Sequence, residues 1–268
     1  MQRIFHTPEG VRDIYSQECS RKQKLQEKLH RVFHQYGFED IETPTFEYFE
    51  VFSKEVGTIP SRELYKFFDR EGNTLVLRPD FTPSVSRACA TYFNPEKEVV
   101  SLCYTGNTFI NNSSFRGRLK ETTQMGVERM GDDSPEADAE ILAMTVECLL
   151  ATGLTEFQVS VGQVDYYKAI FAQTGLSQEE EEELRELISQ KNYFGVEELV
   201  KNKNMDKSLA RVLSQLPQMF GSTEVLEKAK SLTDNPQALK AVARLEEIYE
   251  LLKVYGYEKY VTFDFAML

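Results

Sequence analysis

The sequence contains no tryptophan and only three histidines, and its four cysteines form no Cys-x-x-Cys pair. Zinc sites usually combine closely spaced cysteines and histidines, and small disulfide-stabilised domains carry many cysteines in a short chain. We therefore interpret the cysteines as buried apolar side chains of a protein in a reducing compartment. His30 and His34 lie one helical turn apart, but their predicted helix offers no third ligand, so we predict no metal site.

Long apolar runs are also missing from the sequence. No segment approaches 18 consecutive apolar residues, and residues 1–10 lack the apolar core of a secretory signal peptide. These absences argue against a membrane span and against secretion. They predict a cytoplasmic protein with no membrane partner.

Basic residues are too few to balance the acidic ones. The 268 residues include 31 Lys and Arg against 43 Asp and Glu, which gives a formal net charge of −12. Proteins that bind a nucleic-acid backbone usually present a basic face, because Lys and Arg replace the counterions of the phosphates. The acidic balance therefore disfavours tRNA as a partner, although it does not forbid a local basic strip.

Hydrophobic periodicity predicts a mixed α+β chain up to about residue 164. A helix is expected from Ser16 to a stop at Gly37, because glycine readily adopts the left-handed conformation that ends helices. The other expected elements are strands at 38–44, 65–68, 74–77, 99–109, 120–130 and 157–161, and helices at 82–92 and 134–153.

The character of the sequence changes after residue 164. From there to residue 256 the sequence has a helical pattern and is rich in acidic residues. The last residues return to the alternation of apolar and polar side chains that is typical of a strand. We therefore predict a core over 1–164 and a helical insertion over 165–256. Residues 257–268 are expected to return to the core and to be cut short, because the sequence stops within an apolar stretch.

Polar residues gather on one face of the predicted strand over 120–130. Side chains alternate along a strand, so Thr122, Gln124, Gly126 and Glu128 share a face. Gln124 and Glu128 lie roughly 13 Å apart along the strand, and their side chains can lean together over the bare position at Gly126. A small zwitterion could lie between them. The strand alone is equally compatible with an ordinary solvated outer face.

A second polar element lies at 77–83, where the sequence Leu-Arg-Pro-Asp-Phe-Thr-Pro leads from a strand into a helix. Asp80 can accept hydrogen bonds from an ammonium group, and Thr82 can cap its helix while facing a ligand. By themselves these two residues are most simply interpreted as helix caps. Together with the polar strand they favour a binding site for an amino acid.

Four segments carry a resemblance to a known family: residues 11–13 (Val-Arg-Asp), 37–44, 77–83 and 126–128 (Gly-Val-Glu). In order and spacing they resemble the core of the histidyl-tRNA synthetases. They are still more similar to the regulatory subunits of short-form ATP phosphoribosyltransferases, which are paralogues of those synthetases. The resemblance covers most of the chain outside the helical insertion.

The resemblance implies a class II aminoacyl-tRNA synthetase-like fold, in which helices flank an antiparallel sheet, and a homodimer formed through the segment near 38–52. It implies that Asp80, Thr82 and Gln124 hold the α-amino group of histidine and that Glu128 faces the imidazole. These assignments suit the chemistry, because an ammonium group and a ring N–H both need hydrogen-bond acceptors.

One departure separates the two groups of relatives. In the synthetases the strand that enters the polar loop ends in Phe-Arg, and this arginine binds the ATP α-phosphate and the amino-acid carboxylate. Here Ile110 stands in its place. Loss of one such donor costs roughly 3–4 kcal/mol, or a factor of about 10²–10³ in rate. The second ATP-binding arginine of the family, and its remaining histidine contacts, belong to segments beyond position 268. Arg116 and Arg118 are candidate substitute cations, although a substitute needs accurate geometry as well as charge.

These features predict a regulatory subunit and not an enzyme. It would bind histidine without a cofactor and act on a partner, the catalytic subunit of a short-form ATP phosphoribosyltransferase, in histidine biosynthesis. Allosteric control of this kind requires histidine to bind two assembly states unequally. Two alternatives remain open: a histidyl-tRNA synthetase or a catalytic-core fragment of one, which would use ATP and Mg, and a non-catalytic nucleic-acid-binding module.

Overall fold

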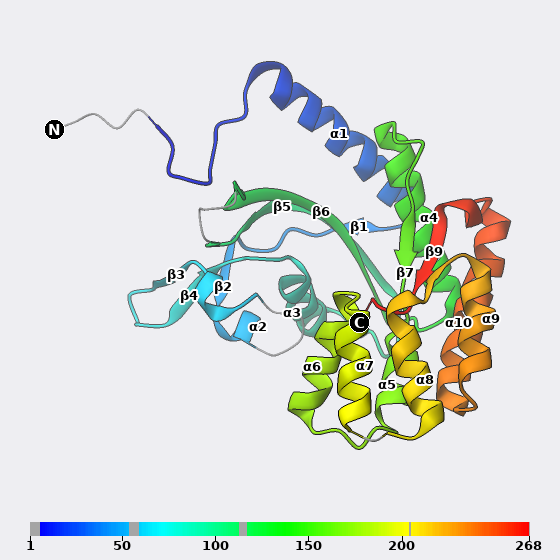
Figure 1. The fold of residues 1–268 in the computed structure, drawn as a ribbon. Helices are drawn as coiled ribbons and strands as arrows, with labels where there is room; N and C mark the ends of the chain where they lie inside the picture. The colour runs from blue at the N-terminus through cyan, green and yellow to red at the C-terminus, as the bar shows by residue number, and fades with distance from the viewer. Residues whose placement is uncertain (1–5, 54–58, 113–116, 204, 268) are drawn as a thin grey trace. The chain divides into compact units, whose positions relative to one another are not determined.

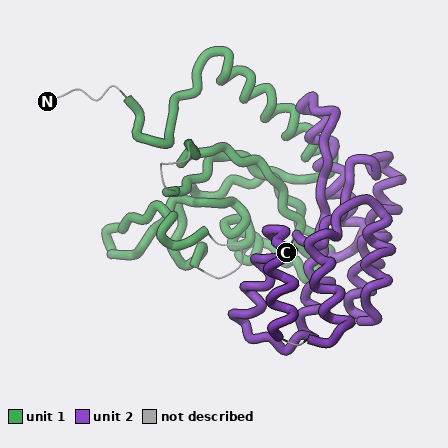
Figure 2. Tube along the Cα trace, viewed as in Figure 1, with its two compact units in different colours: residues 1–132 green, residues 133–268 purple. Residues whose placement is uncertain are grey.

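The computed structural model describes residues 6–53, 59–112, 117–203 and 205–267. The chain divides into two compact units, residues 1–132 and 133–268, which Figure 2 shows in different colours. Within the described residues, no helix is both long and apolar enough to span a membrane.

Unit 1 is built on a long antiparallel hairpin of two ten-residue strands, β5 (Val100–Phe109) and β6 (Glu121–Met130). The short strand β1 (Glu39–Asp40) adds to β5 in parallel, so the sheet order is β1-β5-β6. Helix α1 (Ser16–Gln35) precedes β1 and ends as predicted, because Gly37 takes a left-handed conformation with φ +78°.

A second, antiparallel sheet in unit 1 has the strand order β2-β4-β3. The strands predicted over 65–68 and 74–77 are confirmed as the antiparallel pair β3 and β4. The connection that leaves β4 leads directly into α3 and carries the polar segment 77–83 (Figure 1). The elements of this part are β2 (Phe46–Tyr48), α2 (Glu50–Ser53), the 3-10 helix η1 (Ser61–Glu63), β3 (Lys66–Phe68), β4 (Thr74–Leu77) and α3 (Thr82–Tyr92).

The hairpin of unit 1 presents one face to α3 and the other to α1. Alternate residues of β5 pack against buried side chains of α3 and form a core of Phe81, Val85, Cys89, Val100, Leu102 and Tyr104. Side chains on the opposite face point toward α1, as the hydrogen bond from Lys22 of α1 to Thr123 of β6 shows. Each face therefore carries its own set of polar residues, spaced two apart along the strands.

Unit 2 is mainly helical, with a small sheet of order β7-β9-β8. β9 pairs in parallel with β7 and antiparallel with β8, and α10 packs along α4 and α5. The elements are α4 (Pro135–Thr152), β7 (Val159–Val161), α5 (Val164–Phe171), α6 (Gln178–Ser189), α7 (Tyr193–Asn202), α8 (Lys207–Gln215), the 3-10 helix η3 (Leu216–Gln218), β8 (Phe220–Gly221), α9 (Thr223–Leu232), α10 (Pro236–Tyr255), the 3-10 helix η4 (Glu258–Tyr260) and β9 (Val261–Asp264).

The boundary between the units differs from the division expected from the sequence. The sequence pattern groups residues 133–164 with the N-terminal core, but α4 packs on α10, and Arg244 of α10 pairs with Asp138 of α4 at 2.8 Å. The final strand β9 likewise pairs with β7 and β8 within unit 2. The division into compact units falls after residue 132, because α4 and β7 find their packing partners about 100 residues later in the chain.

The predicted α+β character is confirmed, and so are most element positions. Ser134 caps α4 by accepting a hydrogen bond from the Ala137 amide, and Gly153 ends the helix in a left-handed conformation with φ +98°. The strand predicted over 38–44 is wrong in length, since only β1 pairs with the sheet. The carbonyl of Thr43 instead accepts a hydrogen bond from the buried Arg78 side chain.

Candidate amino-acid-binding site

The four residues predicted to hold an amino acid lie together in unit 1. Thr82 is the first residue of α3, and its hydroxyl donates to Glu128 Oε1 on β6 at 2.7 Å. The Gln124 side-chain amide, also on β6, donates to Asp80 Oδ1 at 3.1 Å. Two side-chain hydrogen bonds therefore join the start of α3 to alternate residues of β6, as the strand period predicts.

The helix-cap interpretation of Asp80 and Thr82 accounts for only part of their contacts. The N-cap position of α3 belongs to Phe81, whose side chain offers no capping group, so Thr82 is not the cap. Asp80 Oδ1 does accept a hydrogen bond from the Phe81 amide at 2.7 Å, in addition to the bond from Gln124. Both polar side chains thus turn toward the strand.

The sequence predicts an open space over Gly126, but Tyr104 fills that space. Tyr104 lies opposite Gly126 in the register of β5 and β6. A Cβ atom at Gly126 would lie 2.4 Å from the Tyr104 hydroxyl, so any larger residue here would force the tyrosine to shift. The Tyr104 hydroxyl also donates to Glu128 Oε1 at 3.4 Å. A ligand between Gln124 and Glu128 would therefore lie against the tyrosine and not against bare backbone.

Tyr104 belongs to a stack of flat groups that forms the floor of the site. Its ring lies parallel to that of Phe81 with centroids 4.4 Å apart, and the Arg78 guanidinium lies 4.0 Å from the Phe81 ring. Arg78 is only 7% exposed and donates to the carbonyls of Asn107 and Thr43 at 2.8 and 2.9 Å. Because backbone carbonyls hold this guanidinium, Arg78 is a structural cation and not a ligand group.

Electrostatics make the site complementary to a cation. Burial raises the pKa of Glu128 above its ordinary value, and the negative charge of Asp80 raises it further. Burial also raises the pKa of Tyr104, with smaller contributions from Glu128 and Asp80. Among the described residues, no basic side chain contributes to the Glu128 shift. A ligand that brings an ammonium group would supply the missing positive charge.

The predicted phosphate-binding position carries no charge. Ile110 follows the end of β5, is partly buried, and donates its backbone amide to the Lys120 carbonyl at 2.9 Å. Of the two candidate substitute cations, Arg118 is exposed, and Arg116 lies outside the described residues. The role of either arginine as a substitute stays a prediction.

Thr122 shares a strand face with Gln124, but its hydroxyl pairs with that of Thr108 at 3.0 Å, away from the other four residues.

Tyr104 and Arg78, which build the floor of the site, were not expected from the sequence. Gly126 and Gly106 are the sequence signal that could have indicated these bulky neighbours, because each glycine leaves room for one of them. A Cβ at Gly106 would lie 2.6 Å from both Arg78 Nη2 and the Phe81 ring.

His30 and His34 find further potential ligands outside their own helix, which the sequence did not show. Their Nε2 atoms lie 2.6 and 3.0 Å from the two carboxylate oxygens of Asp40, and the Cys103 thiol lies 3.5 Å from Asp40 Oδ1. Burial and the neighbouring Asp40 raise the pKa of Cys103 to about 12. Asp40 and Cys103 are far from the helix in sequence, so no local pattern could show them.

Comparison with known proteins shows the family. The family model of histidyl-tRNA synthetases matches residues 10–268. The ATP phosphoribosyltransferase regulatory subunit of Acetivibrio thermocellus is 41% identical over 264 residues, which are 98% of this chain and 63% of that protein. The regulatory subunit of Thermoanaerobacter pseudethanolicus is 38% identical over 265 residues, which are 99% of this chain and 69% of that protein.

Solved structures agree with the sequence comparison. The structure of an ATP phosphoribosyltransferase regulatory subunit/histidyl-tRNA synthetase from Bacillus halodurans matches with a TM-score of 0.90 and 31% identity, covering all of this chain and 70% of that one. The histidyl-tRNA synthetase of a Nostoc species matches with a TM-score of 0.80 at 20% identity, over 99% of this chain and 62% of that one, a likeness of fold alone. The chain belongs to the histidyl-tRNA synthetase family, has its class II α+β fold, and groups within it with the ATP phosphoribosyltransferase regulatory subunits.

Proposed function

We propose that this chain is the histidine-binding part of a regulatory subunit of ATP phosphoribosyltransferase. The observation that carries the proposal is the acidic site of Asp80, Thr82, Gln124 and Glu128 in unit 1, in a chain that has Ile110 at the phosphate-binding position. The relatives named as regulatory subunits support it, although the chain spans only 63% and 69% of two of them.

The proposed contacts of histidine follow from the donors and acceptors of the site. The α-ammonium group donates to Asp80, to the Thr82 hydroxyl oxygen and to the Gln124 side-chain carbonyl, and an imidazole N–H donates to Glu128. Binding exchanges the bonds between Thr82 and Glu128 and between Gln124 and Asp80 for bonds to the ligand. An ammonium group brings a full positive charge to these carboxylates, which the neutral hydroxyl and amide donors do not, and this charge gives binding a driving force.

The proposed protein activates no amino acid and uses no cofactor. Formation of an adenylate from ATP requires a cation at the α-phosphate, and removal of one preorganised donor at a developing charge costs a factor of about 10²–10³ in rate. Ile110 has no charge to supply. The alternative in which the protein is a synthetase that uses ATP and Mg would need Arg118 or Arg116 in that role, and tRNA is not among its proposed partners.

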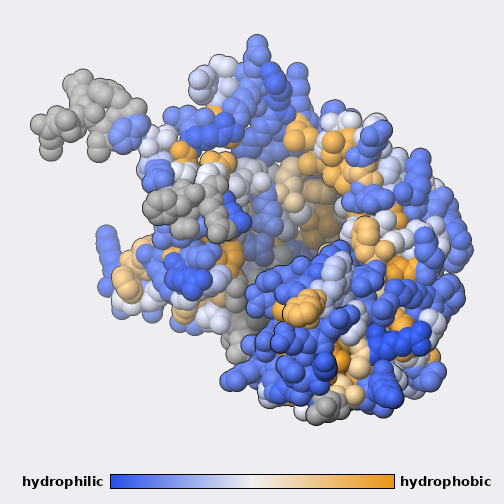
Figure 3. Space-filling view, in the orientation of Figure 1, coloured by the Kyte–Doolittle hydropathy of each residue, from blue (hydrophilic) through white to orange (hydrophobic). Residues whose placement is uncertain are grey.

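The proposed partners are the short-form catalytic subunit and a second copy of the chain. A homodimer through the segment near 38–52 is supported by large aromatic side chains on β2, where Phe46 and Tyr48 are 51% and 54% exposed. Phe68 on the other edge strand of the same sheet is 72% exposed. Figure 3 shows hydrophobic surface among hydrophilic residues in the region of this sheet. Exposed apolar surface of this kind is typical of interfaces. The proposed role places the protein in the cytoplasm.

The proposal is tested by reconstitution. The chain is mixed with a short-form catalytic subunit, and phosphoribosyl transfer to ATP is measured with and without histidine. The expected result is that the mixture responds to histidine and that Asp80→Asn weakens the response. Glu121→Gln, on the opposite face of β6, is the matched control and should leave it unchanged. Transferase activity that ignores both the chain and histidine would contradict the proposal.

A further inference from the structure

We propose that His30, His34, Asp40 and Cys103 form a binding site for a zinc-type transition-metal ion on the α1 face of the sheet in unit 1. This site is separate from the amino-acid site and does not depend on the proposed function. It lies on the face of the β5–β6 sheet opposite α3, where α1 packs.

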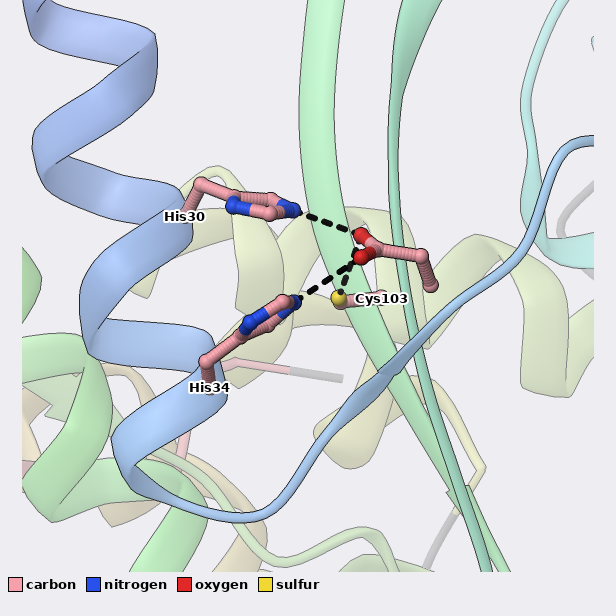
Figure 4. Close-up of side chains that lie close together, drawn as sticks. His30, His34 and Cys103 are labelled. Atoms are coloured by element: carbon pink, nitrogen blue, oxygen red, sulfur yellow. Dashed lines mark hydrogen bonds and ion pairs between the residues drawn. The ribbon is translucent and has the colours of Figure 1, made fainter.

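Helix α1 supplies two ligands from one face. His30 and His34 are four residues apart, so their side chains lie one above the other on the helix. Their ring centroids are 4.1 Å apart, and both Nε2 atoms point at the Asp40 carboxylate, at 2.6 and 3.0 Å. Figure 4 shows both imidazoles reaching from α1 toward the Cys103 thiol. Each histidine therefore directs a ring nitrogen to the same carboxylate.

The sheet supplies the other two ligands. Asp40 on β1 and Cys103 on β5 are partners in the parallel register of these strands, so their side chains leave the sheet on the same face. The thiol lies 3.5 Å from Asp40 Oδ1. This pairing joins residues 63 positions apart in the sequence and completes a set of four ligands.

The spacing of these four groups suits a tetrahedral ion. One ligand atom from each residue lies within 4.8 Å of all the others. Bonds of about 2.0–2.3 Å in a tetrahedral zinc site place ligand atoms roughly 3.3–3.8 Å apart. Side-chain rotations that shift these atoms by up to about an ångström would bring them to coordinating distance.

The kind of ligand selects the class of ion. Two imidazoles, one thiolate and one carboxylate form a mixed nitrogen, sulfur and oxygen set that suits Zn²⁺ and Co²⁺, whereas Ca²⁺ and Mg²⁺ prefer oxygen ligands alone. Four protein ligands leave no open position for substrate, which is typical of a structural site. The bound ion would link α1 to β1 and β5 and stabilise unit 1.

An ion can reach the site from solvent. The side chains of His30, His34 and Asp40 are 41%, 46% and 58% exposed, whereas Cys103 is buried beneath them. Without a metal, the same histidines would merely share the Asp40 carboxylate as hydrogen-bond partners, and the thiol would take no part beyond a weak bond. Cys103 is therefore the residue that separates the two interpretations.

The test is a titration of the full 268-residue chain with Co²⁺, which reports its own ligands. The expected result is one equivalent bound in a tetrahedral site, with visible ligand-field bands and a sulfur-to-cobalt charge-transfer band in the near ultraviolet. Zn²⁺ should displace the cobalt and raise the thermal unfolding temperature. Absence of the charge-transfer band, or a spectrum of octahedral cobalt, overturns the proposal.

Four variants locate the site. Cys103→Ser should abolish the charge-transfer band, and His34→Gln should weaken Co²⁺ binding at least 10-fold; circular dichroism checks that both remain folded. The chain offers matched controls in Cys148→Ser and His6→Gln, which should bind as the parent does. The exposed position of His34 keeps the test decisive even if the buried Cys103 variant fails to fold. Parent-like cobalt binding by His34→Gln would overturn the proposal.

Discussion

Replacement of Glu128 by glutamine should separate histidine binding from the stability of the fold. Burial and the charge of Asp80 raise the pKa of Glu128, so the folded protein holds this proton more tightly than the unfolded chain. The unfolded state then binds fewer protons through the titration range, and stability falls as the pH rises. The contribution of Glu128 is therefore most favourable below its unfolded pKa and is lost as the pH rises through its folded pKa.

Glutamine removes the charge but keeps the shape and the acceptor. Its side-chain carbonyl can still accept the hydrogen bond that Thr82 donates at 2.7 Å. The free energy of unfolding of Glu128→Gln at neutral pH should thus equal or exceed that of the parent, with a weaker decline between acid and neutral pH. Histidine, by contrast, loses a hydrogen bond to a charged group, which is worth about 1.5–3 kcal/mol, or about 10- to 100-fold in affinity.

Two assays test this prediction on the same samples. Urea denaturation at several pH values measures the free energy of unfolding, and titration calorimetry measures the histidine dissociation constant. Glu121→Gln serves as the control, because Glu121 lies on the other face of β6, where its carboxylate accepts a hydrogen bond from Asn107 of β5. An unchanged histidine affinity in Glu128→Gln, or a large loss of stability at neutral pH, would refute the reasoning about the site.

The floor of the site gives two further predictions. Gly126→Ala should lower the free energy of unfolding by about 1–3 kcal/mol, because its Cβ would lie 2.4 Å from the Tyr104 hydroxyl. Chemical denaturation measures this change. Gly221→Ala is the control and should change little, because its Cβ would meet nothing within 4 Å. A cost for Gly126→Ala no greater than the control's would show that Tyr104 moves aside freely. Arg78→Met should lower the free energy of unfolding by about 2–4 kcal/mol in the same assay, because it leaves buried carbonyl groups without a donor. Replacement of the exposed Arg118 by Met should change the free energy of unfolding by no more than about 0.5 kcal/mol. Equal effects of the two arginine variants would contradict the structural role of Arg78.

Local periodicity predicted the polar face of the site correctly because it depends on one strand. The alternation along β6 places Gln124 and Glu128 on the same side whatever β6 pairs with. The floor could not be found in this way. Tyr104 stands over Gly126 only because of the register between β5 and β6, and that register is not visible in either strand alone.

Pairing between distant segments accounts for the other differences. Asp40 meets Cys103 through the parallel pairing of β1 with β5, and such pairing leaves no short-range signal in the sequence. His30 and His34 were visible as a pair, but their partners were not. The division into compact units also depends on pairing of this kind, because α4 packs on α10 and Asp138 pairs with Arg244 about 100 residues later.

The site of Asp80, Thr82, Gln124 and Glu128 is proposed to recognise an amino acid without activating it. The most direct measurement determines histidine binding by calorimetry and histidine-dependent exchange of pyrophosphate into ATP on one preparation of the chain. Histidine is expected to bind without exchange above background, because Ile110 supplies no cation for the α-phosphate. Exchange that depends on histidine would contradict the account.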